Sequence, residues 1–479
     1  MRVLGTHLRS RAWSALLATL VLLPATVSAG GFELPDNGAR AVSRGSAFSV
    51  RADDLTAIAH NPGGLSRLRG THLLYSHNII HAPMRFTRAA SAVPQNDSND
   101  PGSTDPLAPV ENQTPWFALG GMFVASTDFG LDGWTFAIGA YGPNAAGSQK
   151  WDVRGGQRWM LVELEALIVY YSLAVSYGQQ DKWGVGATFQ IAHQPQTKLS
   201  LVVDGTPGGA QNPYYSPTDV LATISLAAPP APTLIVGGWV RPIPSLEFGI
   251  SGRVMPVNLD ASGDITLENT PGGSKFSDSQ LAVEGSAARL RLLLPPTARA
   301  GVRYRHLEGD KERFDVELNV VYEAWSMLDR YNVELDGIIK LFASHEAPDV
   351  TIEKRWKDTF SVRLGGTYNL DAPLSLSAGA FYETGAVPNA YTHLDFPSFD
   401  RLGLAAGVSG NVGNLTWTVA YSHIFQETRK VDEAYAKVYQ QRPISECPDG
   451  CDGYDPVPAN AGTFESSYDI FAVSAAYRF

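Results

Sequence analysis

The last eleven residues of the chain, 469–479, constrain its fold more than any other segment. Every second residue is apolar or aromatic, and the residues between them are smaller or more polar. The apolar set is Phe471, Val473, Ala475, Tyr477 and Phe479. Because successive side chains of a β-strand point to opposite faces, this segment predicts a strand with one face suited to hydrocarbon and the other to a wetter surrounding.

The first 29 residues have the features of an export signal. Three arginines precede a short apolar run, and a cleavage site of small residues ends at Ala29. The apolar run is shorter than the roughly 20 residues that a membrane-spanning helix needs. We therefore expect residues 1–29 to be removed and the mature chain to begin at Gly30.

The composition argues against several classes of protein. The mean hydropathy is −0.10, and no later segment is apolar over the length of a membrane-spanning helix. The net charge of −11 becomes more negative when the signal is removed, which argues against nucleic-acid binding. The 46 glycines and the 10% share of aromatic residues are typical of many short strands with aromatic girdles.

Alternation with a period of two, bounded by turn-forming residues, recurs along the chain and predicts about fourteen strands. They lie at 71–81, 115–126, 132–142, 160–178, 182–193, 232–241, 245–267, 289–308, 312–336, 357–371, 374–384, 400–411, 414–427 and 467–479. The connections alternate between short turns and long loops. An even strand number with loops sorted in this way is the pattern of bacterial outer-membrane barrels, with the long loops outside. We predict an all-β, antiparallel transmembrane barrel over residues 71–479.

Residues 30–70 do not follow the strand pattern. Asp53 and Asp54 precede a short helical segment that the turn residues His60 to Gly64 end. A barrel of fourteen strands encloses a bore that side chains alone do not fill. We therefore expect residues 30–70 to fold inside the lumen as a plug, which we call the hatch.

The two cysteines, Cys447 and Cys451, lie in one Cys-Pro-Asp-Gly-Cys segment. Two thiols are too few for a structural zinc site, and an exported chain meets an oxidising compartment. Pro-Asp-Gly has the turn chemistry that closes a small ring. We predict a local loop disulfide, and we expect neither a metal site nor a cofactor.

Four stretches occur in an order typical of one family. They are the mature start from Gly31-Phe32, the segment Asn61-Pro62-Gly63, the segment Val321-Tyr-Glu-Ala-Trp-Ser326, and the block from Trp356-Lys-Asp-Thr359 to Asp400-Arg401. Together they resemble the FadL/TodX-type outer-membrane transporters of long-chain fatty acids and other hydrophobic compounds. The resemblance implies passive transport: cargo is captured at extracellular loops, held in an apolar lumenal pocket and released sideways through a wall opening that the hatch gates. That opening lies at a kink in the third strand, where Gly139 and Gly142 are the candidates.

The resemblance also suggests residues that contact cargo. Lys357 matches the family's lysine beside a substrate carboxylate, although it could instead be solvated or paired with Asp358. His193 stands where an arginine is expected, and a neutral histidine would weaken selectivity for acids, so the cargo could be a neutral hydrocarbon; a plain strand-end residue is the alternative. In the hatch motif Asn61-Pro62-Gly63, Gly63 replaces the family's alanine. The motif is predicted to contact the third-strand opening or to be only a structural turn.

Two further sets of residues carry predictions. An ion-pair ladder inside the lumen is expected from five arginines of one strand and three acids of the next. They are Arg289, Arg291, Arg299, Arg303 and Arg305, with Asp315, Glu317 and Glu323. In the long loops, residues 221–228 are apolar enough for a short exposed helix, and Leu281-Ala-Val283 adds a second apolar patch for cargo capture.

The alternatives are a barrel enzyme, an adhesin or structural barrel, and a general porin. No Ser/His arrangement favours an enzyme, and the hatch disfavours an open porin. Tyr477 and Phe479 are predicted to form the signal for the barrel-assembly machinery. The expected surroundings are outer-membrane lipid and lipopolysaccharide, and the resemblance suggests a monomer.

Overall fold

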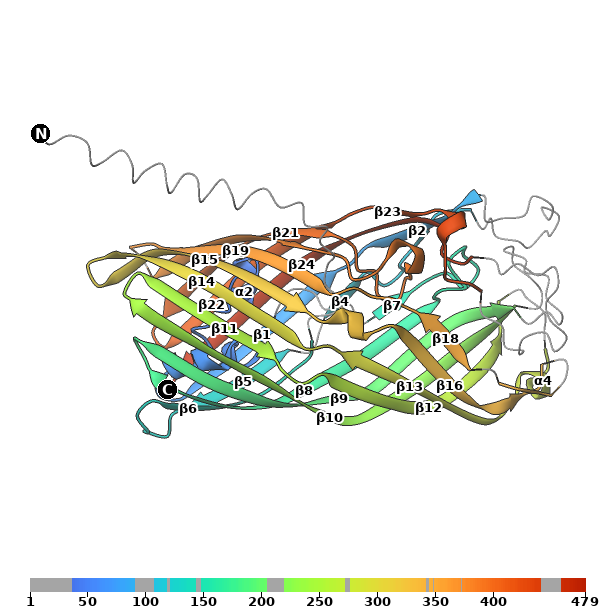
Figure 1. Cartoon of the computed structure of the whole chain (residues 1–479), viewed down its shortest axis with the longest axis horizontal. Helices are drawn as coiled ribbons and strands as arrows, with labels where there is room; N and C mark the ends of the chain where they lie inside the picture. Colours follow the sequence, from blue (N-terminus) through green and yellow to red (C-terminus); the bar gives the residue numbers. More distant parts are fainter. Residues whose placement is uncertain are drawn as a thin grey trace, which may run out of the picture.

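The structure is a computed structural model that describes residues 37–90, 107–118, 121–143, 148–204, 219–271, 276–341, 344–347, 349–371, 373–440 and 458–479. It is a closed antiparallel barrel of fourteen wall strands, as the sequence predicts. The barrel is elongated, and the chain's connections gather at its two ends (Figure 1). The last strand pairs with the first over ten positions, from His72↔Arg478 to His81↔Asp469, and this closes the wall.

Several wall strands are interrupted, so the fourteen strands consist of more segments. The segments are β1 (His72–His81), β2 (Met84–Arg88), β3 (Val110–Glu111), β4 (Trp116–Ala118), β5 (Met122–Thr127), β6 (Trp134–Tyr141), β7 (Ser148–Lys150), β8 (Glu163–Gln179), β9 (Trp183–Asp204), β10 (Asp219–Ile243), β11 (Leu246–Arg253), β12 (Val257–Asn269), β13 (Val283–Leu294), β14 (Thr297–Glu308), β15 (Lys311–Glu323), β16 (Arg330–Ile339), β17 (His345–Glu346), β18 (Val350–Glu353), β19 (Thr359–Asn369), β20 (Leu374–Glu383), β21 (Arg401–Val412), β22 (Leu415–Gln426), β23 (Arg429–Val431) and β24 (Gly462–Arg478). The short turns fall where the sequence predicts them, for example between β14 and β15 and between β21 and β22.

The short helices lie in the hatch and in the connections. They are α2 (Ala39–Ser43), α3 (Ala57–His60), η1 (Pro62–Arg67), α4 (Asp278–Leu281), η3 (Trp325–Met327), η4 (Asn389–Tyr391) and η5 (Glu433–Tyr435). In the described part of the chain, no helix is long and apolar enough to cross a membrane.

β9 and β10 are longer than predicted, and the helix expected at 221–228 is wrong. Those residues belong to β10 and pair with β9 on one side and β12 on the other. Alternate side chains, among them Ala222 and Leu226, turn inward and are buried, whereas Ser225 and Ala227 are exposed. An apolar run that alternates in burial is a strand with an apolar lumenal face. The second predicted patch is not exposed either, because Leu281 is buried in a separate apolar cluster.

A band of interruptions crosses five neighbouring wall strands. Its members are Pro229-Pro230 within β10, residues 254–256 after β11, Pro295-Pro296 after β13, η3 after β15, and residues 354–358 before β19. Proline lacks the N–H that a ladder requires, which accounts for the breaks at the two proline pairs. We call the part of the barrel on the periplasmic side of this band the lower half and the part on the loop side the upper half.

The band changes which side chains face the lumen. Arg299, Arg303 and Arg305 of β14 are half-buried or buried inside, whereas Arg289 and Arg291 of β13 are exposed outside. The expected lumenal ladder is therefore wrong for Arg289 and Arg291. All five arginines have odd numbers, so a simple period-two count places them on the same face of the wall. The break at Pro295-Pro296 shifts the alternation by one position, and the arginines before it therefore face outward while those after it face inward.

In the lower half the outer surface is apolar. Val316, Leu318 and Val320 of β15 are exposed outward, and Asp315, Glu317 and Asn319 between them are buried inside. β24 follows the same rule, since Phe471, Val473, Tyr477 and Phe479 are exposed while Ile470 and Ala472 are buried. The predicted two-faced terminal strand is confirmed, and this apolar belt is the surface that contacts lipid.

The first described residues, 37–70, lie inside the barrel, where α2 appears within the ring of strands (Figure 1). α3 begins after Asp54, whose Oδ1 accepts a hydrogen bond from Thr56 N at 2.8 Å. The helix is thus shorter than the predicted one, and it ends before Asn61-Pro62-Gly63 as expected. The hatch fills the lower half of the lumen.

Candidate functional site

An apolar cavity of about 50 Å³ lies within the upper half. The inward side chains of β8, β9, β10, β13, β16 and β18 surround it. They include Leu164, Leu199, Leu226, Leu292, Tyr331, Val333 and Ile352. A lining of this kind favours hydrocarbon over water, because each CH₂ removed from water contributes about 0.8 kcal/mol.

One end of the cavity is polar. The connection between β20 and β21 folds inward and brings His393 and Asp395 to the lining. Asp395 forms an ion pair with Lys354, with Nζ and Oδ2 2.5 Å apart, and its other oxygen lies 2.9 Å from His393 Nδ1. All three side chains are buried.

The charges at this end cancel. Burial lowers the pKa of His393, although Asp395 opposes the shift, so the imidazole is neutral at pH 7. Burial alone would raise the pKa of Asp395, but His393 and Lys354 outweigh it and hold that pKa well below its usual range. Burial lowers the pKa of Lys354, and Asp395 opposes that shift; the ion pair between them leaves the cavity end with little net charge.

Neither sequence-predicted cargo residue lies at this cavity. Lys357 is exposed, and its backbone N–H donates to Ala386 O at 2.9 Å. His193 faces away from the lumen beside Tyr171, with the ring centroids 6.5 Å apart, whereas the next residue, Gln194, lines the cavity. Their roles beside cargo stay predictions. If the alternation of β19 continued toward the N-terminus, the side chain of Lys357 would face the lumen. The interruption at 354–358 breaks that alternation, and Lys354 faces the lumen instead.

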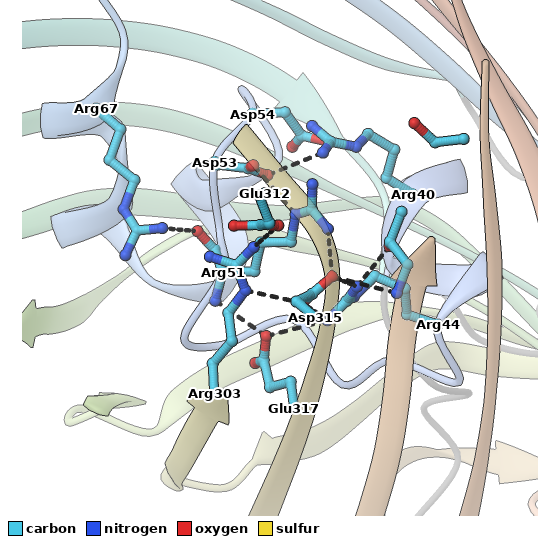
Figure 2. Close-up of polar contacts among 12 residues, drawn as sticks. Arg40, Arg44, Arg51, Asp53, Asp54, Arg67, Arg303, Glu312, Asp315 and Glu317 are labelled. Atoms are coloured by element: carbon cyan, nitrogen blue, oxygen red, sulfur yellow. Dashed lines mark hydrogen bonds and ion pairs between the residues drawn. The ribbon is translucent and has the colours of Figure 1, made fainter. Parts of the chain in front are cut away.

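Below the cavity, a cluster of charges ties the hatch to the wall (Figure 2). Its centre is Asp315 of β15, which accepts hydrogen bonds from three arginines. Arg44 and Arg51 of the hatch donate at 2.7 and 2.8 Å, and Arg303 of β14 donates at 2.8 Å. The lumenal ion pairing predicted for Arg303 and Asp315 is confirmed.

Two further acids extend this cluster. Glu317 accepts from the backbone N–H groups of Val50 and Arg51 at 2.8 and 3.1 Å. Glu247 of β11 binds Arg67 of the hatch at 3.3 Å and Arg303 at 3.0 Å. The role of the hatch arginines in this cluster was not predicted from the sequence. The sequence did contain a signal for this contact, because the hatch is rich in arginine and the strand that became β15 carries acids that face the lumen.

Asn61-Pro62-Gly63 packs against the strands that follow the third. The Nδ2 atom of Asn61 donates to Gly238 O of β10 at 3.1 Å, and Trp239 Nε1 donates to Gly63 O at 3.0 Å. A Cβ atom on Gly63 would lie 2.7 Å from Gly238 Cα and 2.9 Å from Gly184 O. The glycine that replaces the family's alanine therefore permits a close approach of hatch and wall.

Other hatch residues contact the third wall strand, which includes β6. Asn37 Nδ2 donates to Gly142 O at 2.8 Å, and Thr135 Oγ1 donates to Leu68 O at 3.1 Å. A Cβ atom on Gly139 would lie 3.5 Å from Ile58 Cδ1. The structure thus brings the hatch, Gly139 and Gly142 together, and their gating role stays a prediction.

One apolar cluster runs from the cavity to the hatch. It contains Leu292 and Tyr331 of the cavity, then Tyr170 and Tyr141, whose rings are 5.8 Å apart, and finally Ile58 of the hatch. Ala137 of β6 belongs to the same cluster. Packed apolar side chains therefore connect the lining of the cavity with the third wall strand.

The remaining predicted sites are placed as follows. Cys447 and Cys451 lie outside the described residues. Tyr477 and Phe479 face outward with their ring centroids 5.0 Å apart, and their role in barrel assembly stays a prediction. Among the described residues, no group of three or more His, Cys, Asp or Glu side chains is arranged to hold a metal ion.

A lipid-facing barrel with a docked hatch and an apolar lumenal cavity defines an outer-membrane transport protein. The chain belongs to the OMPP1/FadL/TodX family of outer membrane transport proteins, whose model matches residues 20–479. This is a family of transport proteins rather than of enzymes.

Solved structures show the same fold. A FadL homologue from Pseudomonas aeruginosa is 17% identical, with a TM-score of 0.73, and the match covers 94% of this chain and 100% of that chain. The toluene transporter TodX of P. putida is 13% identical, with a TM-score of 0.62 over 93% of this chain and 99% of that one. The toluene transporter TbuX of Ralstonia pickettii is 12% identical, with a TM-score of 0.63 over 94% and 100%.

A sequence relative, an outer-membrane protein of Neisseria meningitidis serogroup B, is 24% identical over 194 residues. That alignment covers 40% of this chain and only 38% of the relative.

Proposed function

We propose that this protein is a passive outer-membrane transporter of small, neutral hydrophobic compounds. Extracellular loops capture the cargo, the upper cavity holds it, and movement of the hatch releases it sideways into the membrane. The observation that carries the proposal is the cavity itself, whose lining is mostly apolar and whose polar end holds an ion pair of opposite charges.

The ion pair at the cavity end favours a neutral cargo. A free carboxylate entering an apolar cavity needs a cation to offset the loss of its hydration. Lys354 is the cation nearest to His393 and Asp395 in the described structure, and Asp395 already neutralises it. A carboxylate would have to displace Asp395, whereas a hydrocarbon needs no such exchange.

Long-chain fatty acids are the second candidate. Lys354 is buried behind the cavity, and a conformational change that separated it from Asp395 would expose a cation to a carboxylate. The FadL homologue among the structural neighbours supports this alternative by analogy only.

Sideways release is supported by the third wall strand. The β5–β6 ladder ends at the pair Phe123↔Ala140, next to the glycines that touch the hatch. β4 pairs with β1, and β7 pairs with β8, beyond that point. The apolar cluster described above reaches this position, so the cargo would leave without contacting water.

Uptake of radiolabelled toluene and oleate by cells with and without the gene tests the proposal. We expect the gene to accelerate toluene uptake more than oleate uptake. Asp395→Asn frees the charge of Lys354 and should shift the preference toward oleate. Asp371→Asn, which removes an exposed partner of Arg313 at a turn, is the matched control. If neither compound enters faster with the gene, the transport proposal falls and an adhesin or structural barrel takes its place.

A further inference from the structure

Two neighbouring wall strands part in the upper half. The ladder between β13 and β16 ends at the pair Leu290↔Val333. The next backbone contact between the same wall strands, at the band of interruptions, joins Ala324 N to Pro296 O at 3.1 Å. Between these points, no strand pairing joins residues 291–294 to residues 326–332 in the described structure. The second segment is the longer one and contains part of η3.

A hollow of about 520 Å³ opens on the outer surface at this place. Its rim is charged, with Arg289, Arg291, Arg330, Asp260 and Glu334. Its floor is apolar, with Leu290, Leu293 and Leu328. A charged rim over an apolar floor matches a lipid molecule, whose headgroup is polar and whose chain is not.

The hollow and the inner cavity lie back to back. Leu290 lines both of them. Tyr331 and Val333 line the inner cavity, whereas the alternate residues Arg330 and Asn332 line the hollow. The two spaces therefore share Leu290, which lies at the last paired position of β13 and β16.

The hollow lies at the edge of the lipid-facing belt. The outward residues of β15, such as Val320, belong to the belt, and Met327 at the hollow is still 50% exposed. Beyond it, most outward residues of β12, β13 and β16 are polar or charged, among them Asp260, Arg289 and Glu334. β13 and β16 run side by side between the membrane-level strands and the loops (Figure 1). This is the depth at which lipid headgroups meet the protein.

We propose that this β13–β16 gap is a lateral entrance through which hydrophobic molecules dissolved in the outer leaflet pass into the cavity. The inference rests on the proposed transport of hydrophobic compounds, and it supplies an entry route separate from the release route at β6. Cargo that has already partitioned into the membrane reaches the cavity without crossing the loops. The rim charges hold the headgroups aside while an apolar molecule moves over Leu293 and Leu290.

The test uses the full-length protein in vesicles that contain a phospholipid with a diazirine at the end of one acyl chain. This lipid cannot leave the bilayer, so its chain labels a lumenal residue only if it passes through the wall. We expect photolabelling of Leu292 and Tyr331 in addition to belt residues such as Val320. Labelling confined to the belt would overturn the entrance.

Blocking the gap provides the second measurement. Leu293→Trp should lower labelling of Leu292 and Tyr331 by roughly tenfold, because an indole fills the space that a chain needs, and should leave belt labelling unchanged. If that variant does not assemble, Leu293→Cys can be modified with a bulky maleimide after folding, in a protein with Cys447→Ser and Cys451→Ser. Leu364→Cys, on the outer face of β19, is the control. Unchanged cavity labelling in the blocked proteins contradicts the proposal.

The proposed transport function and the proposed lateral entrance can be refuted independently of each other. Facilitated toluene uptake without cavity labelling removes the lateral entrance and leaves the transport function. Cavity labelling without facilitated uptake of either compound removes the transport function and leaves a lipid-accessible gap.

Discussion

Along strands β13, β14, β15 and β16, the lower and upper halves of this barrel place the charged side chains on opposite sides of the wall. In the lower half, Asp315 and Glu317 face the lumen, and Val316 and Leu318 face lipid. In the upper half, Leu292 and Val333 face the lumen, whereas Arg291 and Glu334 face outward. Charge thus holds the hatch in the lower half, and under the proposed function apolar contact holds the cargo in the upper half. The comparison implies that hatch docking and cargo binding can be altered independently.

The largest expected effect comes from the hatch charges. Asp315→Asn removes the carboxylate that neutralises Arg44, Arg51 and Arg303, and leaves buried guanidinium groups without it. Breaking a buried ion pair from one side costs about 3–5 kcal/mol. We expect a matching loss in the free energy of unfolding, measured with denaturant in detergent, and larger currents through the variant in planar bilayers.

Asp371→Asn is the control for that experiment, because its ion pair with Arg313 is exposed at a turn and is screened by solvent. Equal stability of the two variants would show that the hatch is not held by charge.

The next effect tests the close approach of the hatch motif to the wall. Gly63→Ala restores the family's residue but places a methyl group 2.7 Å from Gly238 Cα, and such overpacking costs about 1–3 kcal/mol. Gly139→Ala meets its nearest neighbour, Val124 Cγ2, only at 3.1 Å and should cost less. Differential scanning calorimetry of both variants measures the order. If Gly139→Ala lost more stability than Gly63→Ala, the contact of the hatch with the third wall strand would be the more important one.

A smaller effect is expected at the cavity. Val333→Asn places an amide in the apolar lining and should slow toluene uptake by roughly tenfold, since a buried polar group without a partner costs about 1–3 kcal/mol. Asp336→Asn changes an outward residue of the same strand that does not line the hollow, and should leave uptake nearly unchanged. The free energy of unfolding of each variant should lie within about 3 kcal/mol of that of the unmodified protein. Similar uptake by the two variants would contradict the assignment of the faces.

The smallest effect is a dependence on pH at the polar end of the cavity. His393 has a pKa lowered from 6.5 by burial, so the unfolded chain takes up this proton before the folded protein does. Stability therefore falls as the pH drops from about 7 through the window below the unfolded pKa. Asp395 adds no change there, because its lowered pKa keeps it ionised.

Hydrogen exchange of residues 384–400 measures this effect at about pH 7.5 and pH 5.5, on either side of the usual histidine pKa. Exchange should be faster at the lower pH after correction for the intrinsic rate. His393→Phe should remove most of the difference, and an undiminished difference would assign it to another group.

The barrel could be predicted from the sequence because alternation and loop length are local signals. β19 and β24 show this, since their outward residues are those that a period-two count selects. At the band of interruptions, the period-two count assigns side chains to the wrong face of the wall. There Pro295-Pro296 turns Arg289 and Arg291 outward, and the segment 354–358 turns Lys354, not Lys357, toward Asp395.

The candidate site depends on contacts between distant segments, which no local pattern records. Asp315 contacts Arg44, although the two residues lie far apart in the sequence. Lys354 contacts Asp395 only because a long connection folds into the lumen. The apolar segment 221–228 resembles a helix in composition, yet pairing with β9 and β12 makes it a strand. Tertiary pairing overrides local propensity in such cases.

Crystals of the full-length protein soaked with bromobenzene test the central claim most directly, because bromine scatters anomalously and bromobenzene resembles toluene in shape. The account predicts a bromine peak in the upper cavity, among Leu226, Leu292 and Tyr331. Bromine found only beside the charged residues of the hatch, with the upper cavity empty, would contradict it.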